Sequence, residues 1–244
     1  MCGYLDLGWI PGSFAVVVAG SSYIGVFANA DRSSHAPKTK RRSLTVVFGG
    51  TFDPVHIGHL HAASVAADLL DTSILMVLSA RPAHRKVPVA SVEDRWSMLR
   101  AACANLERLI PSDVELRRKG PSYAIETLVS LNASHDDPVI WVLGADAFDL
   151  VHTWYRFDEF VNRCSFLVFT RGGTASTQLP RGFKKADEYD VLKRSSGSVY
   201  FGDQAMMAIS ATTLRLDIAQ GCTPDELLPP GVWEYVRQRG LYLT

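Results

Sequence analysis

The sequence predicts an α/β fold in which an open parallel sheet carries helices on both faces. From residue 44 onward, short apolar runs alternate with longer amphipathic stretches. Several of the short runs are apolar throughout, as expected for strands that are covered on both faces. This alternation is typical of the doubly wound, Rossmann-like architecture. Ligands of such sheets bind beyond the carboxyl ends of the strands, where the strand order reverses.

The individual elements follow from the same periodicity. Strands are predicted at 44–48, 74–78, 114–116, 139–143 and 166–169, each rich in Val, Ile, Leu or Phe. Helices are predicted at 58–70, 92–106, 123–131, 146–162, 211–219 and 223–238. For the last helix we predict Thr223 as the N-cap, Pro224 at the first position and Gly240 beyond the end. Residues 172–198 lack periodicity and are interpreted as a surface excursion.

Length and charge limit the class of protein. The 244 residues suffice for one large domain with an appendage. Because the α/β alternation begins at residue 44, we expect an N-terminal extension at 1–43 and a single domain at 44–244. Lys and Arg together number 25, as do Asp and Glu, so no net field favours nucleic acid or a membrane as a partner. The four cysteines form no CxxC pair, which suits reduced thiols and a cytoplasmic location.

The extension allows two interpretations. Residues 14–30 are apolar and end in an A-x-A pattern, Ala28 to Ala30, of the kind that signal peptidases cleave. The residues before this run contain Asp6 and no Lys or Arg, whereas an export signal begins with a basic region. A poorly ordered or non-native extension is therefore favoured over an export signal.

The strongest functional pattern is GGTFDPVHIGH at 49–59, directly after the first predicted strand. Gly49 and Gly50 permit a tight turn and a close approach of a ligand to the main chain. His56 and His59 are three residues apart and therefore share one face at the start of the next helix. A helix N-terminus presents N–H groups and the positive end of the helix dipole, so this pattern indicates a phosphate site.

The first pattern also allows interpretations other than a phosphate site. Two histidines with Asp53 and His61 nearby could bind a metal ion, but the HExxH spacing is absent. Neither GxxxxGK[ST] nor GxGxxG occurs in the chain, so the turn is not a Walker or dinucleotide fingerprint.

A second anion site is predicted at 209–215, where ISATTLR opens another helix. Ser210 is the expected N-cap, and Thr212 and Arg215 are spaced to reach the same phosphate groups. Taken alone, the pattern would fit plain capping with a solvated arginine. Its occurrence together with the first pattern favours the anion site.

Together, GGTFDPVHIGHL and the downstream ISATTLR resemble the signatures of the HxGH nucleotidylyltransferases. Further segments are similar to one branch, the bacterial nicotinate-mononucleotide adenylyltransferases. These segments are AHRK at 83–86, PSYAIETL at 121–128, GAD at 144–146, WY at 154–155 and GLY at 240–242. The resemblance spans 44–242. The chain departs from the branch at Ala83, where a proline is usual, and at Ala124, where a threonine is usual.

The resemblance implies a role for individual residues. The catalytic residues would be His56, His59 and Arg215. The residues that bind ATP would be Gly49, Gly50, Thr51, Phe52, Gly58, Gly144, Asp146, Ser210 and Thr212. The residues that bind the mononucleotide would be His84, Arg85, Lys86, Ser122, Tyr123, Thr127, Trp154 and Tyr155. Trp154 would stack on the pyridine ring, with a core position as the alternative. Residues 84–86 could equally form a solvated basic turn.

The implied reaction transfers the adenylyl group of ATP to nicotinate mononucleotide, giving deamido-NAD and pyrophosphate in NAD biosynthesis. A phosphate nucleophile, with a second pKa of about 6, is already ionised at neutral pH and needs no general base. Mg²⁺ would arrive with ATP, and no protein ligand is expected for it. The alternatives are an adenylyltransferase acting on nicotinamide mononucleotide or phosphopantetheine, a class I aminoacyl-tRNA synthetase, and a non-catalytic nucleotide sensor. The oligomeric state is not predicted.

Overall fold

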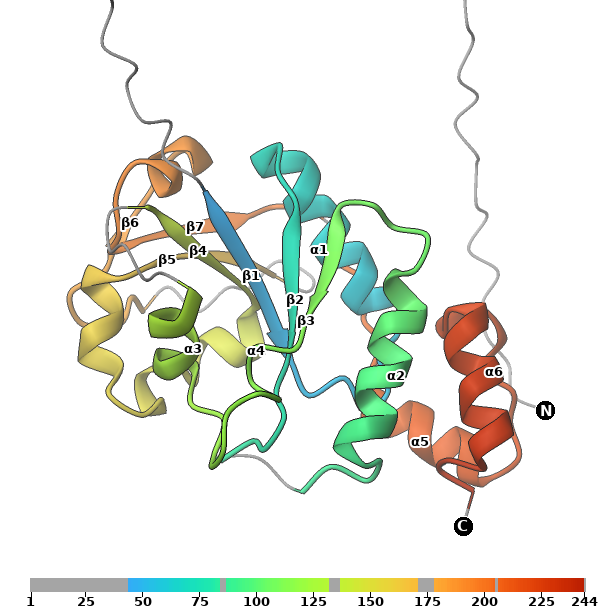
Figure 1. The fold of residues 1–244 in the computed structure, drawn as a ribbon. Coiled ribbons are helices and arrows are strands. Elements are labelled where there is room, and N and C mark those ends of the chain that lie inside the picture. The colour runs from blue at the N-terminus through green and yellow to red at the C-terminus, as the bar shows by residue number, and fades with distance from the viewer. Residues whose placement is uncertain (1–43, 84–86, 132–136, 171–177, 205, 244) are drawn as a thin grey trace, which may run out of the picture. The chain divides into compact units, whose positions relative to one another are not determined.

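The computed structural model describes residues 44–83, 87–131, 137–170, 178–204 and 206–243. The predicted extension, 1–43, lies outside these residues, and the described chain belongs to one compact unit. At its centre is a seven-stranded sheet with the order β3-β2-β1-β4-β5-β7-β6 (Figure 1). Every pair of neighbouring strands is parallel, which confirms the predicted fold class.

The strands are β1 (Thr45–Gly50), β2 (Ile74–Leu78), β3 (Leu109–Ser112), β4 (Val139–Gly144), β5 (Ser165–Phe169), β6 (Lys184–Lys185) and β7 (Ser198–Gly202). The α-helices are α1 (Ile57–Leu70), α2 (Val92–Cys103), α3 (Ala124–Leu131), α4 (Ala145–Phe148), α5 (Ala211–Ala219) and α6 (Pro230–Arg239). Short 3₁₀ helices are η1 (Val151–Thr153), η2 (Phe157–Asn162), η3 (Tyr189–Lys193) and η4 (Asp225–Leu227). Each of these helices is too short or too polar to span a bilayer, a finding that covers the described residues alone.

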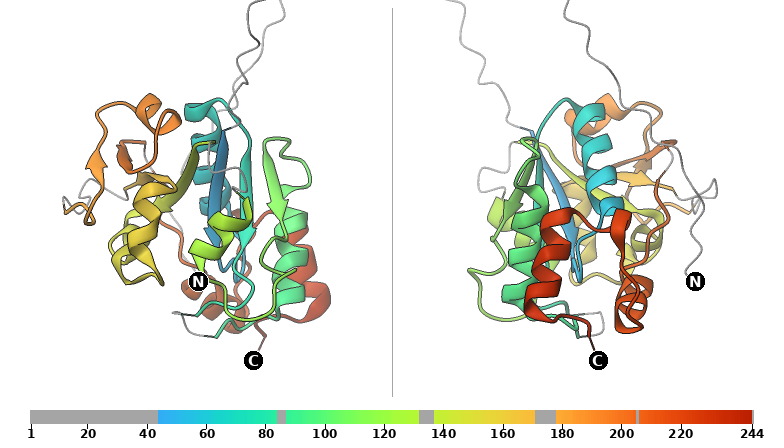
Figure 2. Two further views of the ribbon diagram at one scale, coloured as in Figure 1. Left: turned by 60° about the vertical axis from the view of Figure 1, so that its left-hand side comes forward. Right: turned by 90° about the vertical axis from the view of Figure 1, so that its right-hand side faces the viewer.

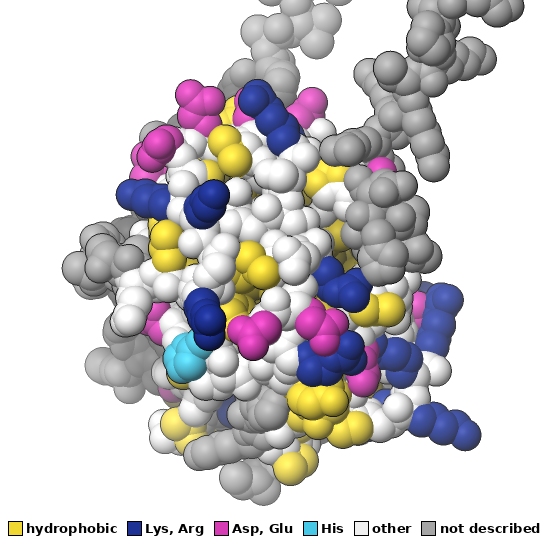
Figure 3. All heavy atoms as spheres, turned by 90° about the vertical axis from the view of Figure 1, so that its left-hand side faces the viewer, with side chains coloured by type: hydrophobic (Ala, Val, Ile, Leu, Met, Phe, Trp, Pro, Cys, Tyr) yellow, Lys and Arg dark blue, Asp and Glu magenta, His cyan; other side chains and the backbone are white. Residues whose placement is uncertain are grey.

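Two apolar cores form because successive side chains of a strand point to opposite faces of the sheet. On β1, Val46 and Phe48 pack with α1, α2, α5 and α6 on one face. Val47, the residue between them, packs with α3, α4, η1 and η2 on the other face. Figure 2 shows helices on both sides of the sheet. On the face drawn in Figure 3, basic and acidic side chains are interspersed, in keeping with their equal numbers.

The order of the strands reverses at β1. The chain runs from β1 to β2 and β3 on one side and then crosses to β4 on the other. The loops that follow β1 and β4 therefore lead to opposite faces of the sheet. A crevice opens between two such loops at the carboxyl ends of the strands.

The strand predicted at 114–116 is wrong. Leu116 and Arg117 donate backbone hydrogen bonds to the carbonyl of Asp113, so this segment is a turn. The strand lies just before it, at β3, on the edge of the described sheet. Pro111 within β3 hid the strand, because a proline removes a ladder donor and is tolerated mainly in edge strands.

The single helix predicted at 146–162 is also wrong, because the chain forms α4, η1 and η2 instead. Trp154 is extended, and Arg156 has a left-handed φ of 54°. The hydroxyl of Thr153 donates to the carbonyl of Leu150, which ends η1 locally. Because of this break, Trp154 lies in an extended segment and not on the face of a continuous helix.

The start predicted for the last helix is wrong as well. The helix α6 begins at Pro230, with Pro229 as its N-cap, while the predicted start at Thr223 precedes only η4. A residue before a proline is disfavoured in the helical region, so 223–228 cannot continue into α6. Gly240 ends the helix with a φ of 60°, as predicted.

The surface excursion predicted at 172–198 conceals part of the sheet. Its described portion contains β6 and η3, and its last residue begins β7. The two lysines of β6 are exposed at the sheet edge and give no apolar signal in the sequence.

The helix predicted at 92–106 is confirmed but ends at Cys103.

Candidate functional site

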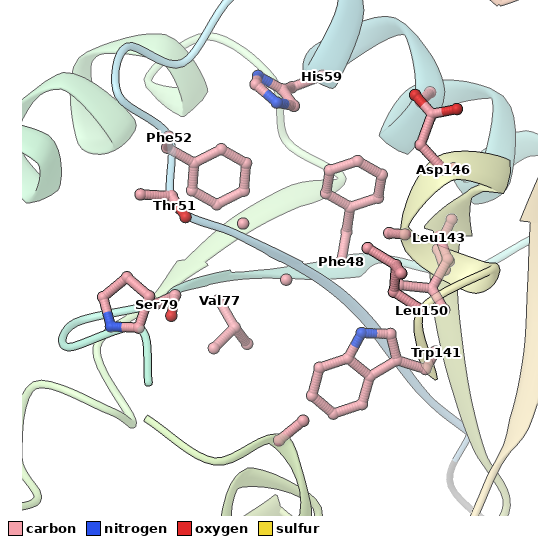
Figure 4. A pocket seen from close by; sticks show the side chains of 18 of the residues that line it. Phe48, Thr51, Phe52, His59, Val77, Ser79, Trp141, Leu143, Asp146 and Leu150 are labelled. Atoms are coloured by element: carbon pink, nitrogen blue, oxygen red, sulfur yellow. The ribbon is translucent and has the colours of Figure 1, made fainter. Parts of the chain in front are cut away.

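A cleft of about 690 Å³ lies beyond the carboxyl ends of β1, β2, β4 and β5. It therefore occupies the crevice where strand order reverses. Figure 4 shows His59 and Asp146 toward one side of the cleft and Trp141 toward the other, with Phe48 and Phe52 between them. Polar groups at one end and aromatic rings at the other suit a ligand that has a charged part and a flat apolar part.

Gly49 and Gly50 line the cleft, but they are the last residues of β1 and not the turn itself, which follows them. A Cβ atom on Gly50 would lie 2.6 Å from the ring of Phe52, and one on Gly49 would lie 3.1 Å from the indole of Trp141. Phe52 is buried and has a left-handed φ of 49°, which is disfavoured for any residue with a side chain. The glycines are therefore required for the packing of this strained turn, and they also keep the main chain open to the cleft.

His56 and His59 meet at the start of α1. His56 is the N-cap and is only 3% exposed, and its ring stacks on that of His59 with centroids 3.6 Å apart. The backbone N–H of His56 donates to Nδ1 of His59, over 3.3 Å. Because Nδ1 accepts, the neutral imidazole of His59 carries its proton on Nε2, the nitrogen that can donate to a ligand.

Gly58 leaves room for this histidine pair. A Cβ atom at Gly58 would lie 3.1 Å from Nδ1 of His56 and 3.4 Å from the carbonyl oxygen of Met207. A residue without a side chain therefore relieves crowding at the start of α1. The residue stands between the histidine ring and the segment that leads to α5.

The second predicted motif opens α5 beside the first. Ser210 is the N-cap and accepts from the backbone N–H of Thr213, as predicted. Arg215 donates to the hydroxyl of Thr212 over 3.3 Å and to the carbonyl of Asp53 over 2.6 Å. The arginine thus joins the two motifs physically. Ala211 lines the cleft, whereas Ser210, Thr212 and Arg215 are not among the lining residues.

A buried arginine that the sequence did not single out supports the loops around the cleft. Arg95 of α2 is 2% exposed and donates to the carbonyls of Thr51, Ser79, Ala80 and Ala90. Burial lowers the pKa of Arg95, and the charge of Asp53 opposes that shift. One side chain therefore ties together the segments that follow β1 and β2. Its sequence context is an ordinary amphipathic helix, so no pattern could reveal this role.

Asp53 is a second supporting residue, and it is 5% exposed. Its carboxylate accepts from the backbone N–H groups of Val89 and Ala90 and from the hydroxyl of Tyr242, over 2.7, 3.1 and 2.8 Å. Asp53 also lines the cleft. The sequence placed it near the histidines as a possible metal ligand, but its partners in the structure are hydrogen-bond donors of the protein.

Gly144 and Asp146 lie where β4 passes into α4. Gly144 is the N-cap of α4, and the side chain of Asp146 is exposed at the cleft. Both positions suit contacts to a nucleotide beyond the end of the strand, where the resemblance places them.

Aromatic side chains form the other end of the cleft. Trp154 is partly buried and meets Trp141 and Phe160 edge to face, with centroids 5.8 and 5.5 Å apart. The rings of Tyr123 and Tyr155 lie 4.4 Å apart at the same cleft. Trp154 therefore belongs both to the edge of the core and to the cleft. Trp141 was missed because it lies inside an apolar strand and looks like an ordinary core residue.

The remaining predicted residues divide into three groups. Ser122 lines the cleft and exchanges hydrogen bonds with the backbone of Arg81. Thr127 is fully buried behind the cleft, where it donates to Glu115 over 2.6 Å and accepts from Arg118 over 2.8 Å. Thr127 is therefore placed to support the cleft and not to line it. His84, Arg85 and Lys86 lie outside the described residues.

Metal ligation by the protein was one alternative for the histidine motif. The described part of the chain contains no group of three or more His, Cys, Asp or Glu side chains suited to hold a metal ion. The rings of His56 and His59 are instead stacked face to face on each other.

Known proteins are similar to this chain in sequence. Residues 47–216 match the family model described as cytidylyltransferase-like. A probable nicotinate-nucleotide adenylyltransferase of Pectobacterium atrosepticum is 35% identical over 210 residues, covering 82% of this chain and 99% of that protein. One from Pseudomonas syringae pv. tomato is 37% identical over 205 residues, covering 80% and 92%.

Solved structures resemble the fold. The nicotinic acid mononucleotide adenylyltransferase of Plasmodium falciparum, complexed with NaAD, has a TM-score of 0.62 at 15% sequence identity. The match covers 82% of this chain and 97% of that one. At this identity, the likeness supports the fold alone.

Proposed function

Because the chain belongs to the nicotinate-nucleotide adenylyltransferases of the cytidylyltransferase-like family, we propose that it transfers the adenylyl group of ATP to nicotinate mononucleotide. The products are deamido-NAD and pyrophosphate, and the reaction belongs to NAD biosynthesis. One observation of the site carries the proposal. The histidine pair at the start of α1 and the arginine of α5 converge on one loop beside an aromatic cleft.

The chemistry requires no general base. A phosphate oxygen of the mononucleotide attacks the α-phosphorus of ATP, and the bond from this phosphorus to the oxygen that bridges to the β-phosphate breaks. Both electrons of that bond leave with pyrophosphate. His59, through Nε2–H, and His56 stabilise the charge that develops on the phosphate oxygens. Arg215 approaches the same phosphates from α5, next to the main chain at Asp53.

The remaining residues align the two substrates. Gly49, Gly50 and the turn after them let ATP approach the main chain, while Gly144 and Asp146 contact the nucleotide beyond β4. Holding both reactants in line lowers the entropic part of the barrier. A sensor would need only to bind the nucleotide, and paired donors at a reacting phosphate favour catalysis over sensing.

Magnesium enters as part of the substrate. Bound with ATP, it would neutralise part of the negative charge of the phosphate oxygens. Mg²⁺ keeps several waters and binds mainly through substrate phosphates, so we assign the ion to ATP and water and name no protein ligand. We also assign the enzyme to the cytoplasm, because its thiols at Cys103 and Cys164 are buried without a disulfide. The catalytic domain is assigned to 44–244.

The choice of acceptor is tested by one assay. Purified protein is incubated with ATP and Mg²⁺ and with nicotinate mononucleotide, nicotinamide mononucleotide or phosphopantetheine in turn, and pyrophosphate is measured. We expect the fastest release with nicotinate mononucleotide. Faster release with phosphopantetheine would transfer the proposal to the rival branch, and release with none of the three would contradict it.

Trp154 should bind the pyridine ring by stacking, since an aromatic face offers one flat surface for another. Trp154→Ala should raise the KM for the mononucleotide roughly tenfold, as loss of one stacked ring does, and leave the KM for ATP nearly unchanged. Steady-state kinetics with either substrate varied measures both constants.

Trp233→Ala is the matched control for Trp154, because Trp233 is also a partly buried tryptophan but lies on α6. Both changes remove apolar contacts and are expected to lower the unfolding temperature. An equal rise of the mononucleotide KM in both variants would show that Trp154 acts only through stability.

A further inference from the structure

The carboxylate of Asp53 connects segments that are far apart in the sequence. It lies in the turn between β1 and α1, and its donors come from residues 89 and 90 and from Tyr242 near the end of the chain. The turn itself contains the strained Phe52, so its conformation must be imposed by its surroundings. Asp53 receives three hydrogen bonds from outside the turn and is well placed to impose it.

Tyr242 is an unusual partner because it follows the last helix. It is 8% exposed, has a left-handed φ of 65° and lies 4.0 Å from the sulfur of Met98. Burial, reinforced by the neighbouring carboxylate of Asp53, raises the pKa of Tyr242 above its ordinary value. The hydroxyl therefore stays protonated at neutral pH and acts as a donor to Asp53.

The same carboxylate faces the proposed catalytic arginine. Nη1 of Arg215 donates to the carbonyl oxygen of Asp53 over 2.6 Å but lies 3.9 Å from Oδ2 of its carboxylate. The carboxylate oxygens are already occupied by neutral donors, the hydroxyl of Tyr242 and two backbone N–H groups. The guanidinium of Arg215 is thus held by a neutral carbonyl oxygen. Its ion pair with the carboxylate of Asp53 is long, at 3.9 Å.

We propose that Tyr242 is a positioning residue for adenylyl transfer, acting through Asp53 to hold the turn after β1 and to keep Arg215 turned toward the phosphates. Without the hydroxyl, the carboxylate loses one of its neutral donors and can close on the guanidinium, because a charged donor is the stronger partner. Arg215 would then neutralise Asp53 and no longer the phosphates. This inference rests on the proposed adenylyl transfer.

The test compares two tyrosines. Tyr242→Phe removes only the hydroxyl, and it should lower kcat roughly tenfold, as loss of a hydrogen bond to a charged group does. The KM for nicotinate mononucleotide should change less than twofold, because its proposed contacts lie on other elements. Tyr235→Phe is the matched control: Tyr235 donates to the carboxylate of Asp94, away from the cleft, and its loss should leave kcat unchanged.

A double-mutant cycle separates this route from a general loss of stability. In an Asp53→Asn background the carboxylate through which Tyr242 holds the turn is already lost, so adding Tyr242→Phe should lower kcat no further. Thermal unfolding of each variant verifies that the protein is folded. If Tyr242→Phe does not fold, Asp53→Asn alone tests the link: kcat should fall at least tenfold with an unchanged mononucleotide KM.

The outcomes are distinct. Equal kcat values for Tyr242→Phe and Tyr235→Phe, additive losses in the double variant, or an unchanged kcat in folded Asp53→Asn would each overturn the inference. Pyrophosphate release by the wild-type protein in the same assay separates these results from a failure of the proposed function, in which the wild-type protein itself would be inactive.

Discussion

His59→Ala should lower kcat by roughly 10²-fold or more while the protein stays folded, because it removes a donor aimed at charge that develops in the reaction. The structure adds a reason for choosing this histidine. The backbone N–H of His56 donates to Nδ1 of His59 and thereby fixes the proton on Nε2. Steady-state pyrophosphate release at saturating ATP and nicotinate mononucleotide measures the effect on kcat.

His61→Ala provides the control for His59. His61 lies on the same helix two residues further along and is not among the residues that line the cleft. Its replacement should leave kcat within about twofold of the wild-type value, in keeping with the small effects of substitutions away from a site. A folded His59→Ala variant that is as active as His61→Ala would remove His59 from the mechanism.

Arg95→Met should lower the free energy of unfolding by about 3–5 kcal/mol, because it leaves buried carbonyls of Thr51, Ser79, Ala80 and Ala90 without their donor. It also removes the charge that faces Asp53. Urea unfolding with linear extrapolation measures the loss. Since these carbonyls lie in the loops that border the cleft, catalytic activity should fall at lower urea concentrations than in the wild-type protein.

Arg100→Met is the matched control for Arg95. Arg100 lies on the same helix, α2, and is exposed, so its replacement should change the free energy of unfolding by less than about 0.5 kcal/mol. If Arg95→Met cost no more than Arg100→Met, the buried arginine would not be the support that its contacts indicate.

The sequence predicted those parts of the molecule where chemistry and periodicity act locally. The strand β2 was predicted with its observed bounds because it is apolar throughout, and α5 because Ser210 marks its start. The histidine pair and the N-cap at Ser210 were likewise found from short-range spacing. The turn predicted at Gly49 and Gly50 begins after them, because both glycines belong to β1. A pattern predicts well when the residues that make it also contact one another.

The sequence failed where the deciding contacts are long-range. Arg95 meets the loops after β1 and β2, and Tyr242 meets Asp53 at a separation of 189 residues. Nothing in the neighbourhood of either residue marks such partners. Thr127 was predicted for the cleft from its place in a family segment, but the fold turns its side chain toward Glu115. Trp141 was concealed by the uniformly apolar strand around it.

In the proposed reaction the adenylyl group moves from ATP to nicotinate mononucleotide in one direct transfer. The most direct measurement uses ATP labelled with ³²P at the α-position, nicotinate mononucleotide and Mg²⁺, with the products separated chromatographically. We expect the label to appear in deamido-NAD and an equal amount of unlabelled pyrophosphate to be released. Label found only in AMP, or retained on the protein as a covalent adduct, would contradict it.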